Sequence, residues 1–224
     1  MRVLRGRGES IGADRAITRR LREHTATTDE PGLRVWQPPR QLTFGRRDRR
    51  RPGYDDARAI ATKMDFPPAE RPVGGRAVAY TGTTIAFART EPVVEDRTGI
   101  QDRYRTISTD VQVGLGELGV HALPGEPPES FCPGSHSLQA EGKVVGIAQR
   151  ISNGVALTAG CLLVADHDAI AAVLSAVYDA LSVPFDPDSV GSVSKAGGPD
   201  DPEIVRSTIE RALLTTTEPT IESV

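Results

Sequence analysis

The two cysteines of this chain lie in contrasting surroundings. Cys132 lies in the Pro/Gly-rich segment 123–134, whereas Cys161 lies in the apolar run 155–164. Most cysteines are small buried apolar residues, and we interpret Cys161 in this way. A loop leaves a thiol few neighbours to bury it, and the thiolate is the form that attacks an acyl carbon. Cys132 is therefore the candidate nucleophile, and the alternative interpretation is a structural loop cysteine.

A nucleophilic Cys132 needs a nearby cation or backbone N–H groups, because an ordinary thiol is mostly protonated at neutral pH. We expect Gly134 to let the loop turn its N–H groups inward. Lys143 begins an apolar strand, and 24 of the 27 basic residues are arginine, so each lysine is notable. Its ammonium is expected to polarise a carbonyl and favour the thiolate. The alternative is an edge-strand lysine that discourages aggregation.

The adjacent pair Gly74-Gly75, flanked by Arg71 and Arg76, is a second chemical signal. Two glycines let the backbone approach a ligand closely, and the arginines would grip phosphate or pantetheine. A Gly-Gly pair is also common in plain turns, so the pattern alone is not specific.

The histidines give little support for a metal or a base. His121, His136 and His167 lack metal-ligand spacing with one another or with the cysteines, which predicts no metal site. His136 would be placed to assist Cys132 as a base, and the alternative is a solvated loop histidine.

Five arginines cluster in the stretch 46–51. Aromatic residues are not interleaved with them and the whole chain is net acidic, which argues against nucleic-acid binding. The cluster is expected either to face an acidic protein partner or to remain solvated.

Composition bounds the class of protein. The chain has 224 residues, 38% apolar content and a net charge of −3, which favours a single globular domain over residues 1–224. Residues 1–10 and 216–224 are expected to be loose termini. Two cysteines are too few for a disulfide framework, and we find neither a signal peptide nor a membrane span, so we predict a cytoplasmic protein.

Apolar periodicity predicts helices and strands that do not alternate regularly. Helices are expected at 12–24, 55–64, 103–118, 170–181 and 201–214, and strands at 33–36, 42–44, 77–80, 83–87, 143–150 and 155–164. Several strands form hairpin-like pairs. The pattern predicts an α+β fold with a mixed, mostly antiparallel sheet flanked by helices.

Three stretches together resemble the lipoate/biotin protein ligase superfamily, and within it the cysteine-dependent octanoyl and lipoyl transferases that relay acyl groups from the glycine cleavage H protein. Residues 45–52 are similar to Gly-x-x-Asp-x-Arg-x-Pro, and residues 71–78 to Arg-x-x-Gly-Gly-x-Ala-Val. Residues 125–150 resemble the nucleophile loop and lysine strand of the relay enzymes. Ser135-His136-Ser137 departs from the acidic or aromatic residues common in the family. The stretch 80–84 lacks the His-Asp and Gly-Asn that ligases favour.

The resemblance implies a fold related to class II aminoacyl-tRNA synthetases and biotin ligases, with a tunnel for an eight-carbon chain beside the double glycine. It implies Cys132 as the acyl carrier and Lys143 as the residue that holds the acyl carbonyl. The residues it places at the acyl substrate are Arg71, Gly74, Gly75, Arg76, Ala77, Gly134, His136 and Gly146.

The implied activity is transfer of an octanoyl or lipoyl group through a cysteine thioester onto a lysine of a lipoyl domain. The implied partners are the glycine cleavage H protein and the acyltransferase subunits of 2-oxoacid dehydrogenases, with no nucleic acid, membrane or organic cofactor. The alternative is a lipoate–protein ligase that uses ATP and Mg²⁺ through lipoyl-adenylate. A third interpretation is a lipoyl-domain binding protein without catalysis.

Overall fold

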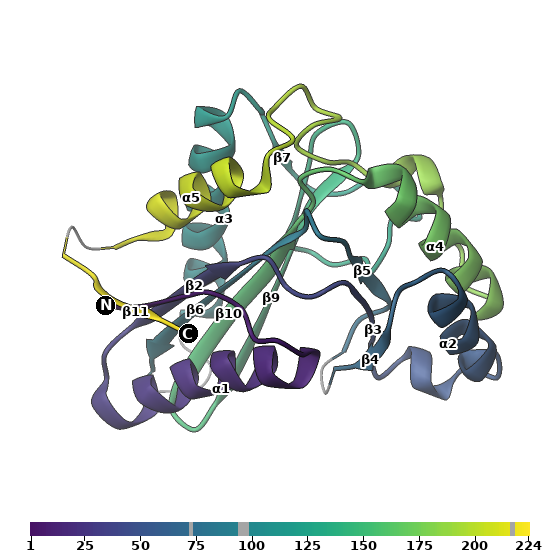
Figure 1. Cartoon of the computed structure of the whole chain (residues 1–224). Coiled ribbons are helices and arrows are strands. Elements are labelled where there is room, and N and C mark those ends of the chain that lie inside the picture. Colours follow the sequence, from purple (N-terminus) through teal and green to yellow (C-terminus); the bar gives the residue numbers. More distant parts are fainter. Residues whose placement is uncertain (72–73, 94–98, 216–217) are drawn as a thin grey trace.

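Two sheets carry the chain in the computed structural model, which describes residues 1–71, 74–93, 99–215 and 218–224 (Figure 1). The large sheet contains β1 (Arg2–Arg5), β2 (Gly32–Trp36), β6 (Ile85–Pro92), β7 (Leu123–Pro124), β8 (Ser137–Gln139), β9 (Lys143–Ser152), β10 (Val155–Leu162) and β11 (Thr220–Ser223). Its strand order is β11-β1-β2-β6-β10-β9-β8-β7. The small sheet, in the order β4-β3-β5, contains β3 (Gln41–Phe44), β4 (Pro68–Glu70) and β5 (Val78–Tyr80).

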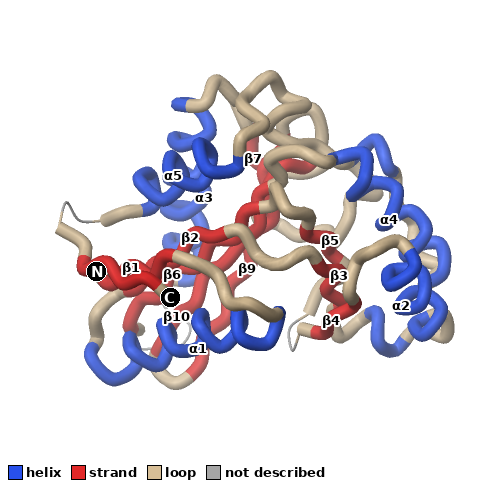
Figure 2. Tube along the Cα trace, viewed as in Figure 1, coloured by secondary structure: helices blue, strands red, loops and turns tan. Residues whose placement is uncertain are grey.

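Helices α1 (Ile11–Thr28), α3 (Ile100–Glu117) and α5 (Pro202–Leu213) pack on the large sheet, and α2 (Tyr54–Lys63) and α4 (His167–Ala180) lie beside the small sheet (Figure 2). Short 3-10 turns lie at Asp48–Arg50 and Pro187–Ser189. Helices α3 and α5 pack on each other and on the large sheet, and α1 packs on β2, β6 and β10. Helices α2 and α4 pack together beside the small sheet. The predicted mixed, mostly antiparallel α+β class is confirmed: among the described strands only the pairs β1–β2, β1–β11 and β3–β4 are parallel.

Local sequence explains the elements that hold the site. The β9–β10 hairpin turns at Asn153 and Gly154, whose φ angles of 53° and 69° match the turn type that Asn-Gly favours. Asp201 caps α5 by accepting hydrogen bonds from the N–H groups of Glu203 and Ile204. Asp166 stands at the N-cap position of α4 without a capping bond, and its carboxylate accepts from the Thr83 hydroxyl instead.

The prediction of loose termini is wrong for the residues that form β1 and β11. Both strands belong to the large sheet, where β1 pairs in parallel with β2 and with β11. Val3 and Leu4 are buried at 1% exposure, and Arg2 pairs with Glu222 across the two strands. A four-residue strand is too short to show a period, so its tertiary pairing could not be seen in the sequence. Residues 216–217 lie outside the described residues.

Two apolar cores result from this arrangement. One lies between the large sheet and helices α3 and α5, and the other lies among the small sheet, α2 and α4. Phe131 and Cys161 belong to the second core, and Cys132 packs against it. Of the helices that the described part of the chain forms, none combines the length and apolar character needed to cross a membrane.

Candidate active site

Cys132 projects its sulfur from a strained loop that connects β7 to β8. Its φ of +42° lies in the left-handed region, which a non-glycine residue rarely adopts and which is found preferentially at functional sites. Two donors converge on Sγ: the Arg71 guanidinium at 3.1 Å and the Arg76 backbone N–H at 3.3 Å. The thiol is half-buried. A guanidinium and a fixed N–H that donate to the sulfur place positive charge where a nucleophilic sulfur needs it.

The Arg71 guanidinium keeps its positive charge beside the Cys132 sulfur. Burial acts to lower the pKa of Arg71, but the electrostatic attraction of Cys132, followed by that of Tyr80, outweighs it and raises the pKa above its ordinary value. The same Nη2 also donates to the Arg76 carbonyl at 2.5 Å, so the guanidinium holds both the sulfur and the turn beside it. Nε of Arg71 is buried without a partner in the described structure. The site therefore contains a fixed cation whose buried Nε lacks a partner among the described residues.

Of the two adjacent glycines, only Gly75 lies where a side chain would not fit. Gly75 has a φ of +89°, and a Cβ there would lie 2.8 Å from the Cys132 sulfur and 3.0 Å from Arg71 Nη2. A Cβ on Gly45 would lie 2.1 Å from the Gly75 carbonyl oxygen, so these two turns also pass in close contact. Gly74 is exposed and a Cβ there would meet no atom within 4 Å. Gly75 lets the backbone approach the nucleophile, whereas the predicted approach of the pair to a ligand stays a prediction.

We expect Gly75→Ala to slow acylation of Cys132 by about 10²-fold, because the new methyl group must displace the sulfur or the guanidinium by a large fraction of an ångström. Gly74→Ala, whose new methyl group meets open space, should lose far less activity. Mass spectrometry of the acylated protein gives the rate, and circular dichroism checks that both variants fold. Equal losses in the two variants would contradict the close-approach role of Gly75.

Asp48 joins the first two motifs of the family resemblance. Its fully buried carboxylate accepts from the Gly45 N–H at 3.1 Å and from the Arg76 guanidinium at 3.4 Å. Burial raises the pKa of Asp48, and these hydrogen bonds oppose the rise. The carboxylate thereby fixes the turn whose N–H points at the Cys132 sulfur. Pro72 and Val73, within the second motif, lie outside the described residues.

Lys143 is buried at 1% exposure and lies at the start of β9, as predicted. Its Nζ donates to Glu126 Oε2 at 2.6 Å, to the Phe131 carbonyl at 2.9 Å and to the Cys132 carbonyl at 3.0 Å. An ammonium has three donors, and these three acceptors use all of them. The structure thus brings Lys143 to the Cys132 residue through the loop backbone. Its role as the ligand of an acyl carbonyl stays a prediction.

Glu126 falls within the stretch 125–150 of the family resemblance, but its residue type and spacing alone do not mark it as a site residue. Besides the Lys143 ammonium it accepts from the Gly134 N–H and the Ser137 hydroxyl, both at 2.8 Å. Burial acts to raise the pKa of Glu126, but hydrogen bonds from Lys143 and Ser137 outweigh it and hold the pKa below its ordinary value. The carboxylate is therefore charged at neutral pH and closes the nucleophile loop onto β8 and β9.

Tyr178 of α4 is a second residue that the sequence did not reveal. Its hydroxyl accepts from the Cys132 N–H at 2.7 Å and donates to the Ala77 carbonyl at 3.1 Å, which ties the loop to the glycine turn. Burial raises the pKa of Tyr178, so the hydroxyl keeps the proton that it donates. Tyr178 falls four residues after Leu174 on the apolar face of the helix, where a tyrosine is normally interpreted as core.

Two predicted site residues have other surroundings. Gly134 does not aim its N–H at the sulfur, because that N–H donates to Glu126, and it has no positive φ that would require glycine. The ring of His136 stacks on Tyr104 of α3 with centroids 3.6 Å apart, and burial lowers the pKa of His136. Among the described residues none of the Cys132 contacts involves His136, so the geometry does not support it as a base.

Gly146 and Cys161 lie on adjacent strands at the apolar side of the site. They are paired in register between β9 and β10, and a Cβ on Gly146 would touch Lys143 Cε at 3.6 Å. Cys161 is buried, as predicted, and burial raises the pKa of its thiol. Cys161 therefore remains a protonated thiol in the core at neutral pH.

Neither of two cavities that the described residues form is the expected apolar tunnel. One cavity, of about 350 Å³, is lined by arginines. The other, of about 430 Å³, is lined by residues of the segments 119–123 and 139–141 and by Ala196. Beside Gly75 the space holds the Arg71 guanidinium and the Cys132 sulfur. Within the described residues no group of three or more His, Cys, Asp or Glu could hold a metal ion.

Comparison with known proteins shows which family the sequence resembles. The family model described as "Lipoyl protein ligase A/B catalytic domain" matches residues 12–214. A protein of Kyrpidia tusciae named octanoyl-[GcvH]:protein N-octanoyltransferase is 33% identical over 153 residues, covering 66% of this chain and 50% of the relative. A Listeria monocytogenes protein named lipoyl-[GcvH]:protein N-lipoyltransferase is 28% identical over 127 residues, covering 56% of this chain and 46% of the relative. The chain spans about half the length of these curated relatives.

Solved structures share the fold. A lipoate-protein ligase A solved with bound ATP superimposes with a TM-score of 0.78 at 22% identity, covering 100% of this chain and 88% of that chain. A T. acidophilum protein described as a putative lipoate protein ligase, solved with bound lipoic acid, gives a TM-score of 0.73 at 19% identity and covers 100% of this chain and 87% of that chain. The predicted relation to lipoate protein ligases is confirmed at the level of the fold.

Proposed function

The chain belongs to the lipoyl protein ligase A/B catalytic domain family, and from this premise we propose that it transfers an octanoyl or lipoyl group through a thioester on Cys132 onto a lysine of a protein. The observation that carries the proposal is the pair of donors on the Cys132 sulfur, Arg71 Nη2 and the Arg76 N–H. A family member that relied only on an adenylate would have no need for a strained, doubly hydrogen-bonded thiol at this point.

In the first step the Cys132 thiolate attacks the acyl carbonyl of the donor. A carbon–sulfur bond forms, the bond to the leaving group breaks, and the leaving amine or thiol takes up a proton. Negative charge moves from the sulfur to the carbonyl oxygen as the bond forms. Arg71 and the Arg76 N–H, which hold the charge on sulfur before attack, are placed to follow it to the adjacent oxygen.

In the second step the ε-amine of a lysine on the acceptor attacks the thioester. A carbon–nitrogen bond forms, the carbon–sulfur bond breaks, the nitrogen releases a proton to solvent, and Cys132 returns as the thiolate beside Arg71. The thioester stores the activation, so this route needs no nucleotide. Apolar core residues adjoin Cys132, and an alkyl cargo buried against them would gain about 0.8 kcal/mol for each methylene removed from water.

The proposed partners are lipoyl-domain proteins. The names of the relatives refer to octanoyl and lipoyl groups in connection with GcvH, the glycine cleavage H protein. We propose the H protein as one partner and the acyltransferase subunits of 2-oxoacid dehydrogenases as further acceptors.

The nucleotide requirement separates this proposal from an ATP-dependent ligase. We expect protein incubated with octanoylated H protein or an octanoyl thioester, with no ATP and with EDTA present, to gain one octanoyl group that hydroxylamine removes. Intact-mass spectrometry measures the adduct, and peptide mapping should locate it on Cys132. Octanoyl transfer that requires ATP and proceeds from free octanoate would instead assign the chain to the ligases.

A further inference from the structure

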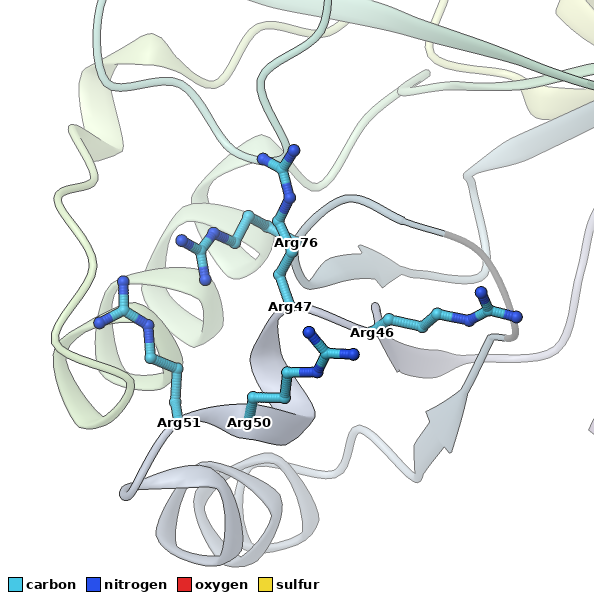
Figure 3. Close-up of a pocket in the computed structure, with 5 residues that line it drawn as sticks. All are labelled: Arg46, Arg47, Arg50, Arg51 and Arg76. Carbon is cyan, nitrogen blue, oxygen red and sulfur yellow. The ribbon is translucent and has the colours of Figure 1, made fainter.

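A concave surface formed only by arginines lies next to the candidate active site. This arginine pocket, of about 350 Å³, is lined by Arg46, Arg47, Arg50, Arg51 and Arg76. Figure 3 shows Arg47, Arg50 and Arg51 extending from the turn before α2, and Arg76 from the glycine turn above it. Arg46 extends away from Arg51.

The positive charge of the arginine pocket is poorly compensated. Within the described residues, Arg46, Arg47, Arg50 and Arg51 have no carboxylate partner, whereas the fifth lining residue, Arg76, pairs with Asp48 at 3.4 Å. Arg49 of the same turn pairs with Glu70 at 3.2 Å. The chain as a whole is net acidic at −3, so this concentration of one sign is local. Guanidinium groups gathered in a concave surface raise the local concentration of anions and bind carboxylates or phosphates in bidentate geometry. An anion is therefore the kind of ligand that the chemistry of this pocket favours.

Arg76 fixes the distance between the arginine pocket and the nucleophile. Its backbone N–H donates to the Cys132 sulfur at 3.3 Å, while its guanidinium lines the pocket. An anion bound there lies about one long side chain away from the sulfur. Acidic residues close in sequence to an acylated lysine would span a similar distance. The phosphate of a phosphopantetheine arm lies much farther from its sulfur, with two amide groups between them, and fits this spacing less well.

We propose that the arginine pocket docks acidic side chains that flank the target lysine of the protein substrate, so that the lysine enters beside Cys132. The inference rests on the proposed function for the meaning of the lysine. Docking itself is a binding event that is measured without acyl transfer. A protein with neutral residues around its lysine would lose the contact and bind more weakly.

The test measures binding of two dye-labelled peptides by fluorescence anisotropy at low salt. Each peptide contains one octanoyl-lysine, flanked in one by Asp and Glu and in the other by Asn and Gln. We expect the acidic peptide to bind the wild-type chain at least about tenfold more tightly, and added salt to remove the difference. The pocket variant Arg47→Glu/Arg51→Glu should lose this preference.

A matched variant controls for overall charge. Arg19→Glu/Arg150→Glu changes net charge by the same amount at exposed positions on α1 and β9, which do not line the pocket. It should keep the preference for the acidic peptide. Arg47→Gln/Arg51→Gln, a milder change, should show an intermediate loss, and thermal melts of all variants verify folding.

Several results would overturn the docking proposal. Equal binding of the two peptides, or equal losses in the pocket and control variants, would remove its basis. Displacement of the bound dye-labelled peptide by phosphopantetheine, but not by the unlabelled acidic peptide, would assign the pocket to a phosphate. Failure of the proposed function is seen separately, as absence of an octanoyl adduct on Cys132 in a protein that still prefers the acidic peptide.

Discussion

Cys132→Ala is expected to reduce octanoyl transfer by at least about 10³-fold, because it removes the only atom that can form the thioester in the proposed route. The backbone of the loop should persist, since the Phe131 and Cys132 carbonyls still accept from Lys143 and the Cys132 N–H still donates to Tyr178. Intact-mass spectrometry with an octanoyl donor should show no adduct. Transfer at a normal rate by this variant would rule out the cysteine route.

Cys161→Ala is the matched control for this loss. Cys161 belongs to the same apolar core, but burial raises the pKa of its thiol and keeps it protonated at neutral pH. Removing the buried sulfur is expected to lower the free energy of unfolding by about 1 kcal/mol while the adduct on Cys132 still forms. A loss of the adduct in Cys161→Ala as complete as in Cys132→Ala would mean that the assay reports disturbance of the core and not loss of the nucleophile.

Residue types and spacing predicted much of this molecule because they act locally. The five helices and the hairpin β9–β10 follow from apolar periodicity, caps and the Asn153-Gly154 turn. Cys132 and Gly75 were predicted as site residues because a loop thiol and a flexible turn carry chemistry wherever they are placed. That prediction needed no knowledge of their neighbours.

The partners of each site residue depend on tertiary packing and were not visible in the sequence. The N–H group that donates to the Cys132 sulfur belongs to Arg76, which lies 56 positions away in the chain. The N–H of Gly134, in the same loop as Cys132, donates to Glu126 instead. Tyr178 looks like an ordinary core residue on the face of α4. Sequence proximity suggested His136 as a helper of Cys132, but packing places its ring against Tyr104. A short-range pattern contains no information about such contacts, because they are set when the two sheets are brought together.

Lys143 is where the sequence and the structure suggest different roles. The resemblance implies a ligand for the acyl carbonyl, whereas all three donors of the ammonium are used by Glu126 and by two loop carbonyls. An ammonium so placed fixes the left-handed conformation at Cys132 and thereby the direction of the sulfur. Reactions of Cys132 that develop no charge on a carbonyl oxygen distinguish the two roles.

We expect Lys143→Met to slow alkylation of Cys132 by iodoacetamide roughly ten- to a hundredfold, since the sulfur loses its fixed direction between Arg71 and the Arg76 N–H. The unsatisfied loop carbonyls should also lower the free energy of unfolding by about 1 to 3 kcal/mol. Adding Glu126→Gln removes the carboxylate that the methionine leaves without its partner, so the double variant should regain part of the stability but not the alkylation rate. An alkylation rate equal to that of the wild type, together with an octanoylation rate lowered about 10²-fold, would assign Lys143 to the acyl carbonyl.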